Sequence, residues 1–334
     1  MRMPYFADPC PLRTALGVLS LAPVAALIFA APGASAQAWP SRPVRVIVPF
    51  AVGGAADRVS RVIAERLGIA FGQQFIADNR PGAGGSIGFE LLSKATPDGY
   101  TLGSASDSAA LLPFIYKGTT WDPRTFTGIS TLTSQPLVLA VHASVPATSV
   151  KELVAWARTR PGQLSFGSSG HGHPQHLAGE MIKLATGIDM NHIPYKGGGA
   201  AIIDLVGGQI PIAVLGSSTV IPHHKAGRVR ILAVTSPRRS PTVPEVPTLE
   251  EAGVKGVDVI QWIGLYGPPK LPRPLADRLN EQVRIAIETP AVRDMLEAAG
   301  FDAAASTPEQ MEARTRNDMQ RWDRLLSKMM LKFD

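Results

Sequence analysis

The sequence predicts an α/β fold built on parallel sheets. Segments that resemble strands and helices alternate along most of the 334 residues, which is typical of parallel strands connected by helices. The apolar strand Val44–Val48 also runs through Gly53 and Gly54 directly into a helix, and four later strands end in similar turns rich in glycine and serine. The economical arrangement of these segments is two lobes joined by two crossings of the chain.

The first lobe is expected to contain both ends of the chain. Its expected strands are short apolar runs at residues 44–48, 74–77, 100–102, 129–133 and 137–141. Its expected helices lie at residues 55–69, 272–288, 290–299 and 308–328. The first of these helices has an apolar face, and the last opens with a capping pattern from Thr307 to Gln310.

The second lobe is expected to be inserted into the first. Ser149 and Glu152 form a capping box that starts a helix. The expected strands of this lobe lie at residues 164–166, 191–194, 210–215 and 230–235, and a strand at 257–266 returns toward the first lobe. We therefore divide the chain into a leader at residues 1–36, lobe 1 at 37–140 and 261–334, and lobe 2 at 141–260.

The leader resembles a secretory signal. It has a basic start with Arg2 and Arg13, an apolar run at residues 15–31, and the small-residue cleavage pattern that ends at Ala36. The alternative is an uncleaved anchor, but the apolar run is shorter than the ~20 residues that a spanning helix needs. We therefore expect a periplasmic protein that is cleaved after Ala36.

The composition beyond the leader narrows the class of partner. The single cysteine, Cys10, lies in the leader, so the remaining chain has no disulfide and no thiol nucleophile. Loss of the leader takes the 33 basic and 27 acidic side chains to 31 and 26, a net charge of +5. This scattered surplus could attract small anions, and we expect no nucleic acid partner. No P-loop is present, and we expect no cofactor.

Five strand-to-helix loops carry the candidate chemistry, and they lie at residues 53–57, 103–108, 167–173, 196–199 and 216–218. Ligands of open α/β sheets bind at the carboxyl ends of the strands. Helix N-termini, backbone N–H groups and serine hydroxyls suit a carboxylate or phosphate. In any one loop, capping and tight turns explain glycine and serine better, so the predicted anion site depends on all five loops together.

Asp57 and three histidines each allow two interpretations. Asp57 either complements the dipole of the helix it begins or accepts a hydrogen bond from a ligand. His171, His173 and His176 could bind a metal, but no nearby cysteine or well-spaced acid completes a zinc pattern and no H-E-x-x-H motif occurs. We therefore expect capping or polar contacts and no metal. A secreted metal-dependent hydrolase that uses these histidines is the enzyme alternative; no G-x-S-x-G elbow is present.

Several segments resemble one family. In chain order they are WPSRPVRVIVPFAVGGAAD, DNRPGAGGSIG, PDGYTL, SVPATSVKEL, FGSSGHGHPQHLAGE, IPYKGGGAAIIDLVGGQI, PHHKAGRVRILAVTS and VPEVPTLEEAG. With them the chain resembles the extracytoplasmic solute receptors of the tripartite tricarboxylate transporter system, the Bug receptor family. The resemblance implies a type II periplasmic binding fold with two lobes, a ligand cleft and two hinge crossings. It also implies a receptor without enzymatic activity that captures a small carboxylate for two membrane subunits, and we expect it to be a monomer.

The resemblance also implies the ligand-binding residues. From the first lobe they are Gly53, Gly54, Ala55, Asp57, Ser104 and Ser106, and from the second Ser168, Ser169, Gly170, His171, Lys196, Gly197, Gly198 and Gly216. The chain departs from the family pattern at Leu215-Gly216, where many members have Asp-Asn, and at His171 and Gly198. Loss of an acid from the cleft favours a di- or aromatic carboxylate over an amino acid. The alternative function is a sensory receptor for a two-component system.

Overall fold

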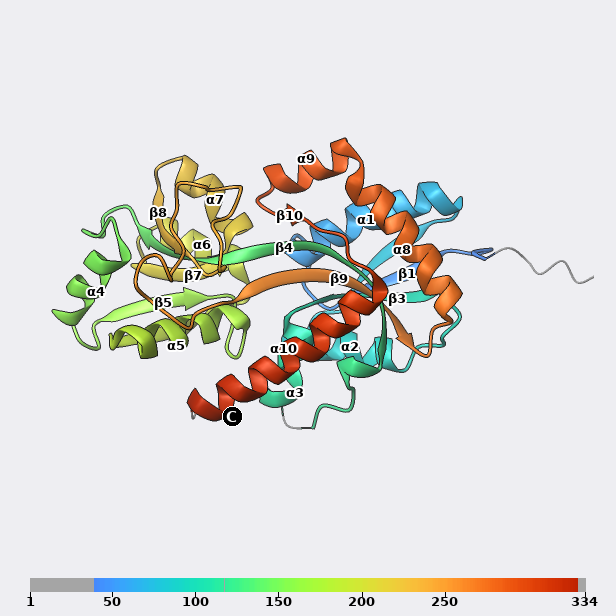
Figure 1. Ribbon diagram of the computed structural model, residues 1–334, viewed down its shortest axis with the longest axis horizontal. Helices are drawn as coiled ribbons and strands as arrows, with labels where there is room; N and C mark the ends of the chain where they lie inside the picture. Colours follow the sequence, from blue (N-terminus) through green and yellow to red (C-terminus); the bar gives the residue numbers. More distant parts are fainter. Residues whose placement is uncertain (1–38, 117, 330–334) are drawn as a thin grey trace, which may run out of the picture. The chain divides into compact units, whose positions relative to one another are not determined.

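The strands and helices build one mixed sheet with helices around it (Figure 1). The computed structural model describes residues 39–116 and 118–329, so the leader and its cleavage after Ala36 lie outside the described residues. All described elements belong to one compact unit, Pro40–Asp334. The strand order is β2-β1-β3-β9-β4-β7-β5-β6, and β8 and β10 each pair with β4.

The elements alternate along the chain much as predicted. The strands are β1 (Val44–Val48), β2 (Phe75–Asn79), β3 (Thr101–Ser106), β4 (Phe126–His142), β5 (Leu164–Ser168), β6 (Met190–Pro194), β7 (Ile212–Gly216), β8 (Val229–Val234), β9 (Ile260–Pro269) and β10 (Asp302–Ala303). The helices are α1 (Ala55–Phe71), α2 (Ser86–Ser93), α3 (Ser108–Ile115), α4 (Val150–Arg158), α5 (Pro174–Thr186), α6 (Gly198–Val206), α7 (Ser217–Lys225), α8 (Arg273–Glu288), α9 (Pro290–Ala298) and α10 (Pro308–Met329), with short 3₁₀ turns at Ala83–Gly85 and Pro123–Thr125.

The long strand β4 corrects the sequence prediction of two strands in this region. Its 17 residues run without a break through Pro136, because that residue lies where the strand changes partners. Residues 126–136 pair with β9, and from Leu137 onward the strand pairs with β7 and β8. A proline has no N–H to give to a ladder, and it is tolerated at such an irregular position.

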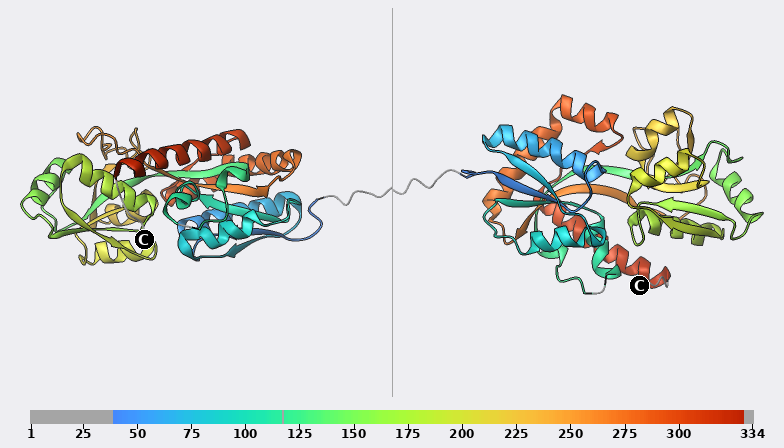
Figure 2. Two further views of the ribbon diagram at one scale, coloured as in Figure 1. Left: turned by 90° about the horizontal axis from the view of Figure 1, so that it is seen from below. Right: turned by 180° about the vertical axis from the view of Figure 1, so that it is seen from behind.

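The sheet therefore has two parts that share β4. The first half-sheet comprises β1, β2, β3, β9, β10 and residues 126–136 of β4, and the second comprises β5 to β8 and residues 137–142 of β4. β1 is parallel to β2 and β3, and β5 is parallel to β6 and β7, whereas β4 and β9 run antiparallel to their neighbours. Figure 2 shows β4 and β9 side by side between the two parts.

Helices cover both faces of the first half-sheet. α2, α3 and α10 lie on one face, where the position of a Cβ at Gly264 in β9 would meet Met311 of α10. α1 packs against α8, and Figure 2 shows the two helices together in the view from behind. Along β3, Gly103 faces Leu92 of α2, so its neighbour Ser104 faces the opposite side, because side chains alternate along a strand.

Local capping signals explain several helix starts. The Ser149 hydroxyl accepts from the N–H of Glu152 at 3.2 Å, while the Glu152 carboxylate accepts from the N–H of Thr148 at 2.7 Å. At α10, Thr307 and Gln310 make both bonds of the predicted capping pair, at 2.9 and 3.2 Å. These two predictions are confirmed because each depends on contacts within one helical turn.

Helix α5 lies directly on β5, and a glycine permits the close approach. The position of a Cβ at Gly179 would lie 2.1 Å from the ring of Phe166, which is fully buried. We expect Gly179→Ala to lower the free energy of unfolding by about 1–3 kcal/mol, because overpacking outweighs the better helix propensity of alanine. Gly199→Ala in α6 is the control, since a Cβ there meets nothing within 4 Å. Urea unfolding of both variants measures the difference. Equal stability of the two variants would contradict this packing.

Candidate ligand-binding site

The loop between β1 and α1 is held from within by Asp57. Oδ2 of Asp57 accepts from the N–H of Gly53 at 2.8 Å, and Oδ1 accepts from Nδ2 of Asn79 at 2.9 Å and pairs with Nε of Arg61 at 2.9 Å. Asn79 Nδ2 also donates to the carbonyl of Phe50 at 3.0 Å. This geometry supports the interpretation of Asp57 as a brace for the loop. Its contact with a ligand stays a prediction.

The same contacts fix the charge of Asp57. Burial would raise the pKa of this carboxyl, but hydrogen bonds from Arg61, Gly53 and Asn79 outweigh burial and lower the pKa below its usual value. Gly54 is the N-cap of α1 and is exposed, and Ala55 is the first residue of the helix. The first N–H groups of a helix have no partner within the helix, so the braced loop leaves α1 with donors at its exposed end.

A row of buried hydroxyls lies across β3, β9 and β4. Ser106 and Thr133 both stand opposite Ile263 of β9, one on each side, so the three side chains share a face of the sheet. Ser104 lies two residues from Ser106 on that face, and Ser106 Oγ bonds Ser108 Oγ at 2.8 Å. The hydroxyls of Ser104 and Thr133 are buried without a hydrogen-bond partner within the described part of the chain.

The loops of the second half-sheet join one another through the backbone. The N–H of Gly197 donates to the carbonyl of Ser169 at 3.0 Å, and a Cβ at Gly198 would lie 3.2 Å from Ser169 Oγ and 3.4 Å from Thr219 Oγ1. Ser168 Oγ bonds the carbonyl and N–H of Gly170, at 3.1 and 3.3 Å. The predicted residues of these two loops therefore lie together, and the side chain of Lys196 is exposed beside them.

Gly216 packs against the side chain of Gln135, a residue that the sequence analysis did not identify as part of the site. A Cβ there would lie 2.7 Å from Nε2 of Gln135, which is itself buried. Gln135 Oε1 accepts from the N–H of Ser218 at 2.9 Å, and Gln135 Nε2 donates to Oε1 of Gln261 at 2.8 Å. Gly216 thus provides space for Gln135 to cap α7, and its predicted ligand contact stays untested.

One further contact connects the two halves at the start of α7. The Ser217 hydroxyl donates to the carbonyl of Gly300 at 3.1 Å, and a Cβ at Gly300 would lie 2.6 Å from Cα of Ser218. The Ser218 hydroxyl is buried and, among the described residues, has no hydrogen-bond partner. Gly300 follows α9 of the first half, so the buried Ser218 lies where the two halves meet.

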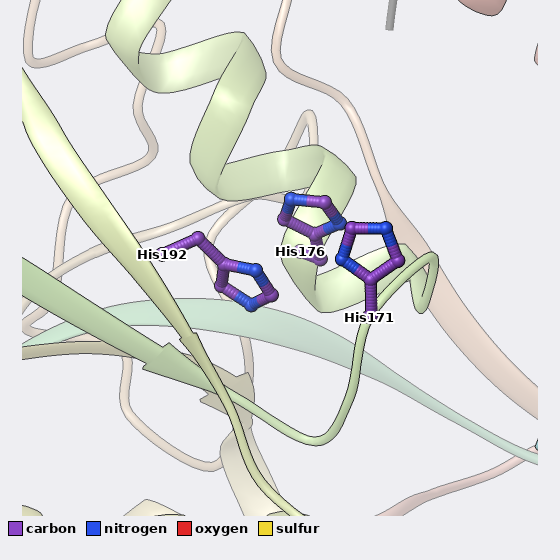
Figure 3. A group of neighbouring side chains, drawn as sticks. All are labelled: His171, His176 and His192. Carbon is purple, nitrogen blue, oxygen red and sulfur yellow. The ribbon is translucent and has the colours of Figure 1, made fainter. Parts of the chain in front are cut away.

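The structure gathers a different set of histidines from the one considered in the sequence. His171, His176 and His192 each place one ring nitrogen within 4.8 Å of the others (Figure 3), and His173 is not part of this group. His192 was missed because it lies on β6, outside the His-rich segment. Burial, aided by neighbouring imidazoles, lowers the pKa of His176 to about 3 and that of His192 to about 4. Both rings are therefore neutral at physiological pH.

A buried carboxyl follows β3 at the start of α3. Asp107 is 1% exposed, and neither of its oxygens makes a well-formed hydrogen bond within the described residues. Burial raises its pKa well above the usual value, and the charge of Asp318 adds to the effect, while Arg314 opposes it. Asp318 accepts from Nε1 of Trp262 at 2.7 Å. The interior between α3 and α10 therefore favours the protonated acid.

This geometry defines a class of protein. The two half-sheets share the long strand β4, polar loops end the parallel strands of each half, and Ser104, Thr133 and Ser218 carry buried hydroxyls that have no hydrogen-bond partner among the described residues. That is the architecture of a type II periplasmic solute-binding protein. No helix within residues 39–116 and 118–329 combines the length and apolar character required to cross a membrane.

Comparison with known proteins gives the family. Residues 59–331 match the model of the tripartite tricarboxylate transporter family receptor. Protein BugT of Bordetella pertussis is 34% identical over 294 residues, which cover 86% of this chain and 89% of BugT. The chain belongs to this receptor family, whose members are receptors rather than enzymes.

Two solved structures from Rhodopseudomonas palustris carry ligands. Rpa4515 with adipate is 32% identical with a TM-score of 0.83, and the match covers 88% of this chain and 99% of that one. MatC with bound malate is 28% identical with a TM-score of 0.76, and covers 86% and 99%. The sequence prediction of family and fold class is therefore confirmed.

We expect the brace at Asp57 to be measurable. Asp57→Ala removes the acceptor of the Gly53 N–H and one of the two acceptors of the Asn79 amide, so it should lower the free energy of unfolding by about 1–3 kcal/mol. Glu65→Ala is the control, because Glu65 is an exposed acid on the same helix. Chemical denaturation of the two variants provides the measurement. A loss no larger than that of Glu65→Ala would show that the brace contributes nothing.

Asp107 should make stability depend on pH. Because its folded pKa is raised, the protonated acid stabilises the fold fully below the unfolded value of about 3.8, and this stabilisation is lost as pH rises through the folded value. Asn stays neutral, so Asp107→Asn should gain stability relative to the native chain as the pH rises from about 4 into the neutral range. Thermal unfolding across that range tests this. Parallel curves, as expected for the exposed control Asp294→Asn, would contradict it.

Proposed function

We propose that this receptor captures a small di- or aromatic carboxylate in the periplasm and presents it to the membrane subunits of a tripartite transporter. The ligand would bind between lobe 1, residues 37–140 and 261–334, and lobe 2, residues 141–260. One chain supplies both lobes, so we take the receptor to be a monomer. The leader would be removed after Ala36, because that segment has the pattern of a secretory signal.

The buried hydroxyls are the observation that carries this proposal. Ser104 and Thr133 in the first half and Ser218 in the second have hydroxyls with no partner among the described residues. Each unpaired buried hydroxyl costs about 1–3 kcal/mol, so such groups are expected where a ligand or a bound water completes the bonding. Hydroxyls and helix N-termini are neutral donors, and neutral donors suit a carboxylate without a bound counterion.

The chemistry of the predicted site favours an acid without an amino group. Asp57 is the one acidic side chain among the predicted residues, and both of its oxygens already bind Gly53, Asn79 and Arg61. An ammonium group would therefore find no free carboxylate there. The adipate and malate of the two solved relatives are likewise dicarboxylates without an amino group, which supports the same ligand class.

Closure of the lobes would couple binding to delivery. A ligand that contacts both lobes stabilises the closed arrangement by its differential affinity and shifts the population toward it. Ser218 lies at the junction of the halves beside Gly300, so a ligand that bonds its hydroxyl would act directly on that junction. The membrane subunits could then distinguish the loaded receptor from the empty one.

A thermal-shift panel tests the proposed ligand class. Malate, adipate and benzoate should be compared with glutamate and aspartate, and with 2-oxoglutarate and succinate as their counterparts without an amino group. A binder at 100 times its Kd adds about 2.7 kcal/mol to stability. Ser104→Ala should weaken the best binder by about 1.5–3 kcal/mol, since a hydrogen bond to a charged group is lost. Ser327→Ala on the exposed face of α10 is the control.

The outcomes separate clearly. Binding of an acid together with its loss in Ser104→Ala supports capture through the buried hydroxyls. Tight binding of glutamate or aspartate without their counterparts would contradict the ligand class. No shift with any acid in the panel would contradict carboxylate capture itself.

A further inference from the structure

We propose that His171, His176 and His192 form a three-imidazole site for a divalent metal of the zinc class, with a fourth position that a carboxylate oxygen of the ligand can fill. The three rings come from separate places, namely the loop after β5, the first turn of α5 and strand β6 (Figure 3). One nitrogen of each lies within 4.8 Å of the others. The role of the fourth position rests on the proposed function, whereas the metal site does not.

The hydrogen bonds of His176 define which of its nitrogens can bind a metal. A backbone N–H can only donate, so the bond from Gly172 to Nδ1 at 3.1 Å shows that Nδ1 carries the lone pair. The neutral ring then has its proton on Nε2, which lies 3.9 Å from Oε1 of Glu180. A metal on Nδ1 would replace the Gly172 N–H and leave the outer N–H facing a carboxylate.

That arrangement approaches the usual support of a metal-binding histidine, although at 3.9 Å the nitrogen and the carboxylate oxygen are close without being hydrogen-bonded. Such a ring typically donates its second N–H to a carboxylate, which fixes its tautomer and makes the ligand nitrogen more basic. Glu180 is itself fixed by Lys183, whose Nζ lies 3.0 Å from each of its oxygens. The carboxylate is therefore held close to the outer nitrogen of His176 on the same helix.

His192 has a comparable outer partner. Its Nε2 lies 2.7 Å from the Ser168 hydroxyl, which bonds the Gly170 carbonyl at 3.1 Å. If the hydroxyl hydrogen goes to Gly170, Nε2 of His192 must donate to Ser168, and the lone pair of this ring is then on Nδ1. His192 therefore bonds Ser168 through one nitrogen and has its lone pair on the other, whereas the lone pair of His176 already accepts from Gly172 and a metal there would have to displace that N–H.

Two adjustments bring the rings into a metal geometry. Zinc–nitrogen bonds of 2.0–2.1 Å place tetrahedral ligand atoms about 3.4 Å apart. The distances between the three ring nitrogens, which now extend to 4.8 Å, must therefore shorten. His176 and His192 stack at 3.7 Å between ring centroids with an interplanar angle of 13°, so one of them must turn to aim at the same ion. His171 is exposed on a loop with positive φ at Gly170 and Gly172, and in the proposed site its ring would shift to complete the coordination.

The donor set selects the metal and leaves room for a ligand. Three imidazoles and no thiolate suit Zn²⁺, Co²⁺, Ni²⁺ or Cu²⁺ rather than Mg²⁺ or Ca²⁺. Three protein ligands leave one tetrahedral position open, as in other zinc sites that bind an exchangeable group. Because His171 is exposed beside the predicted binding residues Ser169 and Gly170, a carboxylate held by these loops could supply the fourth oxygen.

The metal site is tested by itself, with tag-free mature protein and no carboxylate. Zn²⁺ should bind with one ion per chain by calorimetry, and Co²⁺ should give the visible absorption of a four-coordinate ion. His171→Ala and His192→Phe should each abolish both signals, the second while keeping a flat ring in the stack. Glu180→Gln should weaken Zn²⁺ by about 10–100-fold. His223→Ala removes an imidazole outside the cluster and should change nothing.

The results are decisive in both directions. Absence of Zn²⁺ binding, or equal binding by the native chain and His192→Phe, overturns the metal site. If Zn²⁺ binds but the affinity for the carboxylate is the same with Zn²⁺ and with chelator, the role of the fourth position is overturned while the metal site stands. If no carboxylate binds with or without Zn²⁺, the proposed function fails, and the metal result remains independent of it.

Discussion

The antiparallel pairing of β4 with β9 is the constraint on which the rest of the structure depends. These strands connect the two half-sheets, so every loop that could hold a ligand is positioned by their register. Gln135 extends this constraint beyond the backbone: it bonds Gln261 on β9 and caps the first turn of α7. Gln135 therefore connects the crossing physically to the N-terminus of a helix in the second half.

The same register explains why the buried hydroxyls lie together. Ser106 and Thr133 flank Ile263, and Ser104 follows on the same face, because residues opposite one another in an antiparallel ladder point the same way. Ser218 is connected to the strand crossing by the bond from its N–H to Gln135 Oε1, and it packs against Gly300. A polar row thus crosses a largely apolar sheet, and burial of the Ser104 and Thr133 hydroxyls costs free energy because neither has a hydrogen-bond partner in the part of the chain that the structure describes.

The features that the sequence predicted correctly are those that depend on short-range contacts. The capping patterns of α4 and α10 and the strand–turn–helix order of β1 and α1 lie within a few residues, so local physics is enough. The continuity of β4 was missed because a proline such as Pro136 usually ends a strand. It is tolerated here because β4 changes its pairing partner at this residue, from β9 to β7. The roles of Gln135, Thr133 and His192 depend on residues far away in the chain, and no local pattern indicates them.

The two halves contribute different chemistry to the candidate site. The first half supplies a helix start braced by Asp57 and a set of neutral hydroxyls, which suit the carboxylate that all such ligands share. The second half carries the departures from the family pattern, and there the neutral, half-buried imidazole of His192 bonds Ser168 and stacks on the buried ring of His176. Neutral rings can donate, stack or coordinate, whereas charged ones would attract any anion alike. If the proposed carboxylate contacts both halves, discrimination between carboxylates would therefore belong to the second half, which would contact the part of the ligand that differs.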